Sequence, residues 1–143
     1  MSKQLPEGRN SLFVYGSLMC ADIMSRVCDW EGEGTAALLQ GYRRCRIKRA
    51  NYPGILADPL ASVDGVLYQG IPESAWIRLD SFEGSLYRRQ EVTVSTGMNR
   101  QIATQTYVIS PDCIDQLEPG GWDFDDFLNN EKAAFMLEHG LER

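Results

Sequence analysis

The stretch Ser11-Leu-Phe-Val-Tyr-Gly-Ser-Leu18 decides how the chain begins to fold, because a short apolar and aromatic run stops at a glycine. Residues 11–15 have the length and composition of a buried strand. Gly16 allows a tight turn, so we expect 16–19 to form a loop before a short helix over 21–27. The sequence therefore begins with a predicted strand, a glycine loop and a helix.

Outward from this stretch, the hydrophobic pattern predicts more strands than helices. Val, Thr and Ile alternate with other residues over 87–95 and 101–109, which is typical of a hairpin. Asp123 and the acidic residues after it are expected to begin a C-terminal helix. We therefore predict an α+β fold with a mostly antiparallel sheet, although the pattern does not determine whether this sheet closes. The other expected elements are strands over 34–50, 55–57 and 66–71 and a helix over 73–82.

Composition narrows the classes of protein to which the chain can belong. It has 143 residues, of which 43% are hydrophobic and 24% charged, as expected for a single globular domain over 1–143. A net charge of −6 disfavours general nucleic-acid binding. The sequence shows neither an apolar run of the ~18 residues that a membrane span needs nor the apolar block of a secretory signal. We expect a cytoplasmic protein with no nucleic-acid or membrane partner.

Cysteine and histidine content narrows the possible chemistry. The four cysteines form no Cys-x-x-Cys pair and are accompanied by one histidine, so we predict neither a zinc site nor a disulfide framework. His139 precedes Gly140, as expected in the last turn of a helix. A catalyst built from this chain is therefore expected to use carboxylate, Tyr, Arg or backbone groups.

The loop after the first strand is one candidate site. Gly16 lets the backbone approach a ligand closely, and successive N–H groups that lead into a helix can bind an anion such as a carboxylate. The alternative is an ordinary strand-to-helix turn in which Ser17 caps the helix.

Glu83 is a second candidate, because it lies between Phe82 and the helix-ending Gly84. A carboxyl at an apolar helix end loses water, which raises its pKa toward the range useful for proton transfer. The alternative is an exposed Glu in the last turn of the helix, and the same alternative applies more strongly to Asp80.

The predicted hairpin carries the third candidate group. Alternation places Tyr87 and Arg89 on one face, where Arg89 could pair with an acid and a Tyr hydroxyl could orient a ligand. Tyr107 lies on the partner strand, on the face opposite that of Thr106 and Val108. The alternative is cross-strand packing with the guanidinium in water. The basic block over 43–49 could form a phosphate-binding stripe, but a solvated strand face fits an acidic chain better.

Together, in this order and spacing, the motifs resemble the gamma-glutamylcyclotransferase-like family, and within it the gamma-glutamylamine cyclotransferase or avirulence-induced-gene branch. The resemblance covers residues 11–109. It implies a small β-barrel with flanking helices and a cavity, in which a gamma-glutamyl amide is cyclised to 5-oxoproline and an amine or amino acid is released without a cofactor or metal. The matching motifs are Phe13-Val-Tyr-Gly-Ser-Leu18, Gly41-Tyr-Arg43, Tyr52-Pro-Gly54, Leu79-Asp-Ser-Phe-Glu-Gly84, Tyr87-Arg-Arg89 and Tyr107.

The resemblance also implies roles for particular residues. Glu83 matches the acid/base of the family, and Tyr107 resembles a residue that lines the cavity. Tyr87 and Arg89 match a family motif, and either substrate binding or structural support is open for them. A monomer with a gamma-glutamyl small molecule as its ligand is expected; the alternative is a barrel that binds a small carboxylate without chemistry. The residues that match the substrate-binding loop are Tyr15, Gly16, Ser17 and Leu18.

Overall fold

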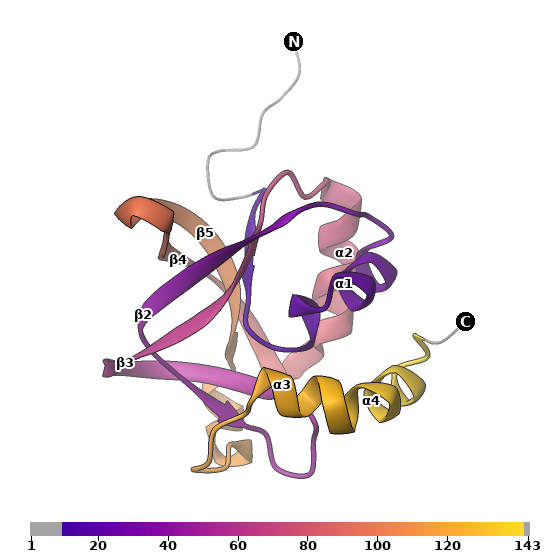
Figure 1. Cartoon of the computed structure of the whole chain (residues 1–143). Helices are drawn as coiled ribbons and strands as arrows, with labels where there is room; N and C mark the ends of the chain where they lie inside the picture. The colour runs from indigo at the N-terminus through magenta and orange to yellow at the C-terminus, as the bar shows by residue number, and fades with distance from the viewer. Residues whose placement is uncertain (1–9, 142–143) are drawn as a thin grey trace.

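A closed barrel dominates the structure, a computed structural model that describes residues 10–141. In this part of the chain five strands form the barrel in the order β1-β3-β2-β4-β5. The helices lie together along one side of it (Figure 1). The predicted fold class is therefore confirmed. The strands are β1 (Leu12–Val14), β2 (Gly34–Arg46), β3 (Pro53–Tyr68), β4 (Tyr87–Thr96) and β5 (Arg100–Ile109), and the main helices are α1 (Ala21–Cys28), α2 (Glu73–Glu83), α3 (Phe124–Asp126) and α4 (Lys132–Glu138).

The long strands β2 and β3 form an antiparallel pair that the sequence only partly predicted. Two short strands were expected over 55–57 and 66–71, but β3 runs without a break from Pro53 to Tyr68. This expectation was wrong because the pairing with β2 shifts register between Gln40 and Tyr42. That irregularity leaves Pro59 without a ladder partner, and a proline is tolerated at such a position.

The predicted hairpin is confirmed as β4 and β5, and side chains help to join it to β1. The ladder between β1 and β5 has only one residue pair. The hydroxyl of Thr106 donates to the carbonyl oxygen of Phe13 at 2.9 Å, and the Ser11 hydroxyl donates to Thr104 Oγ1 at 2.7 Å. Both threonines are fully buried. These hydrogen bonds help to close the barrel where the backbone ladder is short.

Strand β1 is buried on both faces, which explains its continuous apolar sequence. Leu12 and Val14 face the core between the barrel and the helices, whereas Phe13 and Tyr15 face the core inside the barrel. Because Tyr15 follows the strand directly, the loop that begins at Gly16 starts at the boundary between these two cores.

The C-terminal helical segment begins where the sequence predicted. Asp123 caps it, because its carboxylate accepts from the Asp126 N–H at 2.8 Å. The backbone then forms a π-helical turn over Phe127–Glu131 before α4. The extra residue in this turn gives Phe127 and Phe135 a common buried face. Leu128, by contrast, is 39% exposed, because the π-helical turn interrupts the α-helical period at this point.

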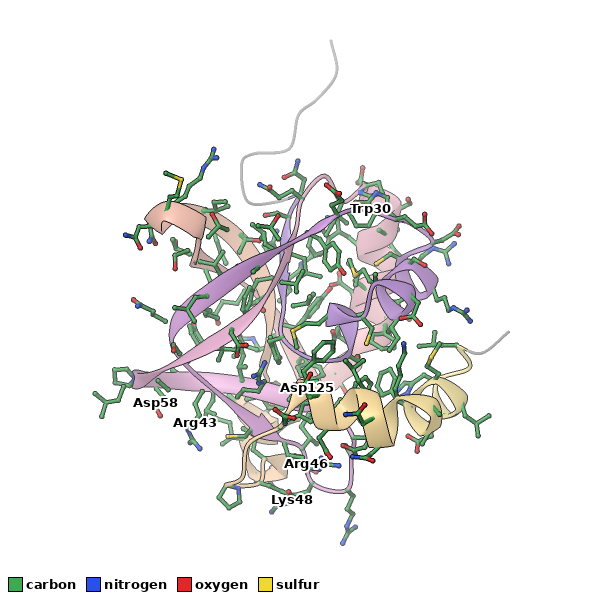
Figure 2. All side chains as sticks on the ribbon, in the orientation of Figure 1. Trp30, Arg43, Arg46, Lys48, Asp58 and Asp125 are labelled. Atoms are coloured by element: carbon green, nitrogen blue, oxygen red, sulfur yellow. The ribbon has the colours of Figure 1, made fainter. Side chains whose placement is uncertain are left out.

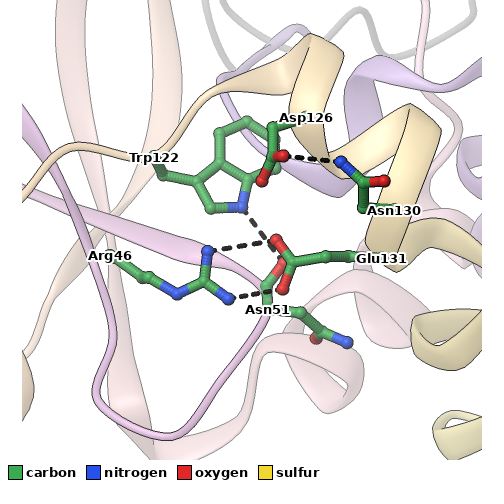
Figure 3. Close-up of polar contacts among 6 residues, drawn as sticks. All are labelled: Arg46, Asn51, Trp122, Asp126, Asn130 and Glu131. Carbon is green, nitrogen blue, oxygen red and sulfur yellow. Dashed lines mark hydrogen bonds and ion pairs between the residues drawn. The ribbon is translucent and has the colours of Figure 1, made fainter.

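Polar contacts hold this segment on the barrel (Figure 3). Arg46 at the end of β2 forms a two-pronged ion pair with Glu131, with 3.0 Å between Nη1 and Oε1. The Trp122 indole N–H donates to the carbonyl oxygen of Asn51 at 3.1 Å. These contacts fix the start of α4 next to the turn between β2 and β3.

The basic block on β2 is largely paired with acids. Arg43 lies 3.3 Å from Asp58, and Figure 2 shows the two side chains at the same edge of the barrel. Arg44 lies 3.1 Å from Asp64. With Arg46 held by Glu131, three of the block's arginines have acidic partners, so the block does not form an unpaired stripe.

No helix within residues 10–141 is both long enough and apolar enough to cross a membrane.

Candidate functional site

A cavity of about 220 Å³ lies where the end of β1, the end of α2, the β4–β5 hairpin and α4 meet. All the predicted site residues except Arg89 line it. Residues far apart in the sequence are therefore brought into one site. The lining comprises Phe13–Leu18, Tyr52, Pro53, Phe82, Glu83, Ser85–Tyr87, Tyr107, Phe135 and His139.

Gly16 is required by a close contact with the barrel. A Cβ at this position would lie 2.8 Å from Cδ of Pro53, which is too short for an ordinary contact. Its φ of −131° lies outside the left-handed region that favours glycine, so the close contact with Pro53 is what requires a residue without a Cβ here. The loop and the turn at Tyr52-Pro53 thus form adjoining parts of the cavity lining.

The backbone of the loop presents free donors. Met19 and Cys20 donate to the carbonyl oxygens of Gly16 and Ser17, each at 3.0 Å. Within residues 10–141, by contrast, the N–H groups of Ser17 and Leu18 have no acceptor. The alternative in which Ser17 caps the helix is wrong, because its side chain makes no capping hydrogen bond. The two N–H groups are available to an anionic ligand oxygen.

Glu83 is the last residue of α2, which ends there because Gly84 adopts a φ of +68°. The carboxyl lines the cavity, so the alternative of an exposed surface Glu is wrong. Loss of water on burial, reinforced by the nearby Asp80 carboxylate, raises the pKa of Glu83 to about 8. Among the ion pairs of residues 10–141 none involves Glu83. The carboxyl can therefore exchange a proton close to neutral pH.

Three tyrosines surround Glu83, and each hydroxyl already donates within the protein. Tyr15 donates to the carbonyl oxygen of Tyr107, and Tyr87 donates to that of Pro53 at 2.7 Å. The Tyr107 hydroxyl donates to Oδ1 of Asp80 at 2.6 Å. Burial raises the pKa of all three, so they stay protonated. Their oxygens are therefore left as acceptors for the N–H groups of a ligand.

Arg89 lies outside the cavity lining. Its guanidinium is 3.4 Å from Oδ2 of Asp80 and stacks over Trp76 at 4.7 Å from the ring centre. The predicted pairing with an acid is therefore present. Since Asp80 in turn accepts from Tyr107, the position of Arg89 favours structural support over substrate binding.

Four aromatic side chains that the sequence did not single out as site residues form one wall of the cavity: Tyr52, Phe82, Phe135 and His139. His139 ends α4 as predicted, and its ring also stacks on Phe135 at 4.2 Å between centres. The i, i+4 spacing of these two residues was the available signal that they share a helix face.

The cavity lining contains few charged side chains. Neither Lys nor Arg is among the lining residues, and Glu83 is the sole carboxyl there. Over the described part of the chain, no group of three or more His, Cys, Asp or Glu side chains could hold a metal ion. The cavity thus offers backbone donors, tyrosine acceptors, one carboxyl and an aromatic wall.

Known proteins share this sequence pattern and fold. Residues 12–124 match the family described as gamma-glutamyl cyclotransferase, AIG2-like. AIG2-like protein C of Arabidopsis thaliana is 32% identical over 130 residues, which cover 87% of this chain and 73% of the relative. A solution structure of an Arabidopsis thaliana protein aligns with a TM-score of 0.72 and 26% identity, over 99% of this chain and 86% of the other.

A more distant structure adds evidence on the fold. A solved gamma-glutamyl cyclotransferase aligns with a TM-score of 0.64 over 76% of this chain and 68% of its own. At 20% identity, this similarity shows a shared fold. The match to the family model extends from β1 to the start of the C-terminal helical segment and confirms the resemblance seen in the sequence. The chain therefore belongs to the AIG2-like gamma-glutamyl cyclotransferase family.

Proposed function

We propose that the protein cyclises a gamma-glutamyl amide to 5-oxoproline and releases an amine, with Glu83 as the acid/base. The observation that carries this proposal is the Glu83 carboxyl in the lining of a cavity that also includes Ser17 and Leu18, whose backbone N–H groups have no acceptor within residues 10–141. Loss of water raises the pKa of this carboxyl to about 8. Such a pKa suits a group that must both accept and donate a proton.

Two sets of polar atoms in the cavity, the loop N–H groups and the tyrosine oxygens, suit the two ends of a glutamyl group. The N–H groups of Ser17 and Leu18 would bind the α-carboxylate. The tyrosine oxygens would accept from the α-amino group and the amide N–H. Held at both ends, the glutamyl chain would fold so that its amine lies over the γ-carbonyl carbon, which removes much of the entropic cost of cyclisation.

One carboxyl, that of Glu83, can carry out each proton transfer that the reaction needs. The Glu83 carboxylate takes a proton from the α-ammonium, and the freed nitrogen attacks the γ-carbonyl carbon to form the ring C–N bond. The C–N bond to the departing amine then breaks while protonated Glu83 returns that proton to the leaving nitrogen. The Glu83 carboxylate next takes the second proton from the ring nitrogen and passes it to the released amine, which leaves as an ammonium ion. The products are 5-oxoproline and an amine, and Glu83 ends in its starting state.

The experiment that tests this proposal is a product assay with the purified protein. Gamma-glutamyl amino acids, gamma-glutamyl amines, gamma-glutamyl-ε-lysine and glutathione are incubated with and without a chelator, and 5-oxoproline is measured by mass spectrometry. We expect 5-oxoproline from at least one compound. A protein that binds these compounds but releases no 5-oxoproline would instead be a carboxylate-binding barrel.

A further inference from the structure

Arg44 is the member of the basic block on β2 that reaches the loop after β1. Its Nη1 donates to the carbonyl oxygen of Tyr15 at 2.9 Å and to that of Asp64 at 3.1 Å. Its Nη2 lies 3.1 Å from Oδ1 of Asp64, and the Arg44 side chain is only 17% exposed. Tyr15 is the residue between β1 and the loop that begins at Gly16. Arg44 therefore joins β2 to the base of this loop.

The Tyr15 carbonyl depends on Arg44 for its hydrogen bond. The ladder between β1 and β3 ends at the pair Val14 and Val66, so the Tyr15 carbonyl lies beyond it. Tyr15 is buried, and the described residues supply no donor to its carbonyl other than Arg44. A buried carbonyl without a donor is costly, which explains why a guanidinium is brought to this point.

The hydrogen bond from Arg44 determines where the first N–H of the loop points. In a planar trans peptide the carbonyl and the following N–H point in opposite directions, so holding the Tyr15 carbonyl also fixes the Gly16 N–H. The carbonyl groups of Gly16 and Ser17 accept from N–H groups later in the same turn, each at 3.0 Å, which fixes the N–H groups of Ser17 and Leu18. The turn thus orients itself, but Arg44 orients its base.

Arg44 also places a positive charge behind the loop. It is absent from the cavity lining, which contains no Lys or Arg, so a bound carboxylate would meet only N–H dipoles directly. A guanidinium that donates to a carbonyl polarises that peptide and makes its N–H a stronger donor. The acidic partner, Asp64, is 85% exposed, so water screens its charge more than that of Arg44. The arrangement therefore favours an anion on the cavity side of the loop.

We propose that Arg44 is a positioning residue for substrate binding: it holds the Tyr15–Gly16 peptide so that the loop N–H groups face the cavity, and its charge strengthens their hold on the α-carboxylate. This inference rests on the proposed cyclotransferase function and concerns one end of its substrate. Arg44 acts through the loop, since its own side chain does not line the cavity.

The test compares calorimetric binding of 5-oxoproline and 5-oxoprolinamide, in which a neutral carboxamide replaces the carboxylate. We expect the wild-type protein to bind 5-oxoproline more tightly. In Arg44→Gln the ratio of the two affinities should fall by about tenfold, the effect of one weakened charge-assisted hydrogen bond. Arg43→Gln removes the same charge from the same strand at a side chain that pairs with Asp58 outside the lining, so it should leave the ratio unchanged. Equal losses in the two variants would indicate a general effect of charge and overturn the proposal.

A second variant keeps the test valid if Arg44→Gln does not fold, which circular dichroism shows. Arg44→Lys keeps the charge and the apolar stem, but a single ammonium cannot reproduce the guanidinium fork between Tyr15 and Asp64, so part of the preference for the carboxylate should still be lost. A folded Arg44 variant with the wild-type ratio would overturn the proposal. A wild-type protein that does not prefer 5-oxoproline would overturn it as well.

Failure of the proposed function gives a different result. If no gamma-glutamyl compound yields 5-oxoproline, the reaction is absent, and the affinity ratio still tests the role of Arg44. Where 5-oxoproline does form, Arg44→Gln should raise KM with little change in kcat, because the loop binds the carboxylate and not the reacting atoms. If 5-oxoproline forms and kcat falls at an unchanged KM, the function stands and the inference about Arg44 is wrong.

Discussion

The two ends of the cavity are built in different ways. The polar end combines the loop after β1, Glu83 and the tyrosines, and its members sit in short sequence motifs on strand and helix ends. The aromatic end combines Tyr52 and Phe82, which lie in two of the matching motifs, with Phe135 and His139 at the C-terminal helical end, which lie outside them. In the proposed function the polar end supplies the reaction chemistry, whereas the rings of the aromatic end pack against one another next to it.

The largest expected effect is on turnover at the polar end. Glu83→Gln keeps the size of the side chain but cannot shuttle a proton, so kcat should fall by about 10²–10⁴-fold while substrate binding is largely retained. Glu73→Gln, at the exposed first turn of the same helix, is the matched control. Kinetics and calorimetric binding measured separately check the prediction. Near wild-type turnover in Glu83→Gln would remove Glu83 from the mechanism.

At the aromatic end the main effect should be on stability. Phe135→Ala removes a fully packed ring, and the free energy of unfolding should fall by about 3–5 kcal/mol. Leu137→Ala, on the exposed face of α4, should change it by less than about 0.5 kcal/mol. Urea unfolding followed by circular dichroism measures both. A Phe135→Ala protein as stable as the control would show that the aromatic end is not part of the core.

A smaller effect is expected at the junction between the two ends. Gly16→Val forces a side chain against Pro53, so we expect weaker substrate binding and a loss of about 1–3 kcal/mol in the free energy of unfolding. Gly97→Val, in the β4–β5 connection, is the control because a Cβ there meets no atom within 4 Å. Titration of 5-oxoproline alongside circular dichroism tests the variant. Unchanged affinity in a folded Gly16→Val protein would place the ligand elsewhere.

The polar end is also expected to make stability depend on pH. The pKa of Glu83 is raised from 4.5 to about 8 in the folded protein, so its favourable contribution is complete below about pH 4.5 and is lost as the pH rises through 8. The Tm of Glu83→Gln relative to the wild type should therefore increase between pH 5 and pH 9. Thermal unfolding at constant ionic strength measures this difference. A pH-independent difference would show that Glu83 is not buried as an acid.

Much of the polar end was predictable because its residues lie at the ends of strongly patterned elements. Burial of β1 on both faces gives a continuous apolar run that stops at Gly16, and the helix before Gly84 places Glu83 at its last position. The pKa direction of Glu83 also followed from its apolar neighbour. The position of Arg89 outside the cavity did not follow, because strand alternation specifies a face but not the depth of a side chain.

The sequence by itself determined the α+β class, the hairpin, the start of the C-terminal helix and the motifs that indicate the family. Only the tertiary structure decided that the sheet closes, that β3 is continuous and that His139 belongs to the cavity. The physical reason is that local periodicity reports which face of an element is buried, whereas closure and cavity walls depend on pairings between distant segments. The ion pair between Arg46 and Glu131 is such a long-range contact. Together with the local π-helical turn over Phe127–Glu131, it places Phe135 and His139 against the cavity.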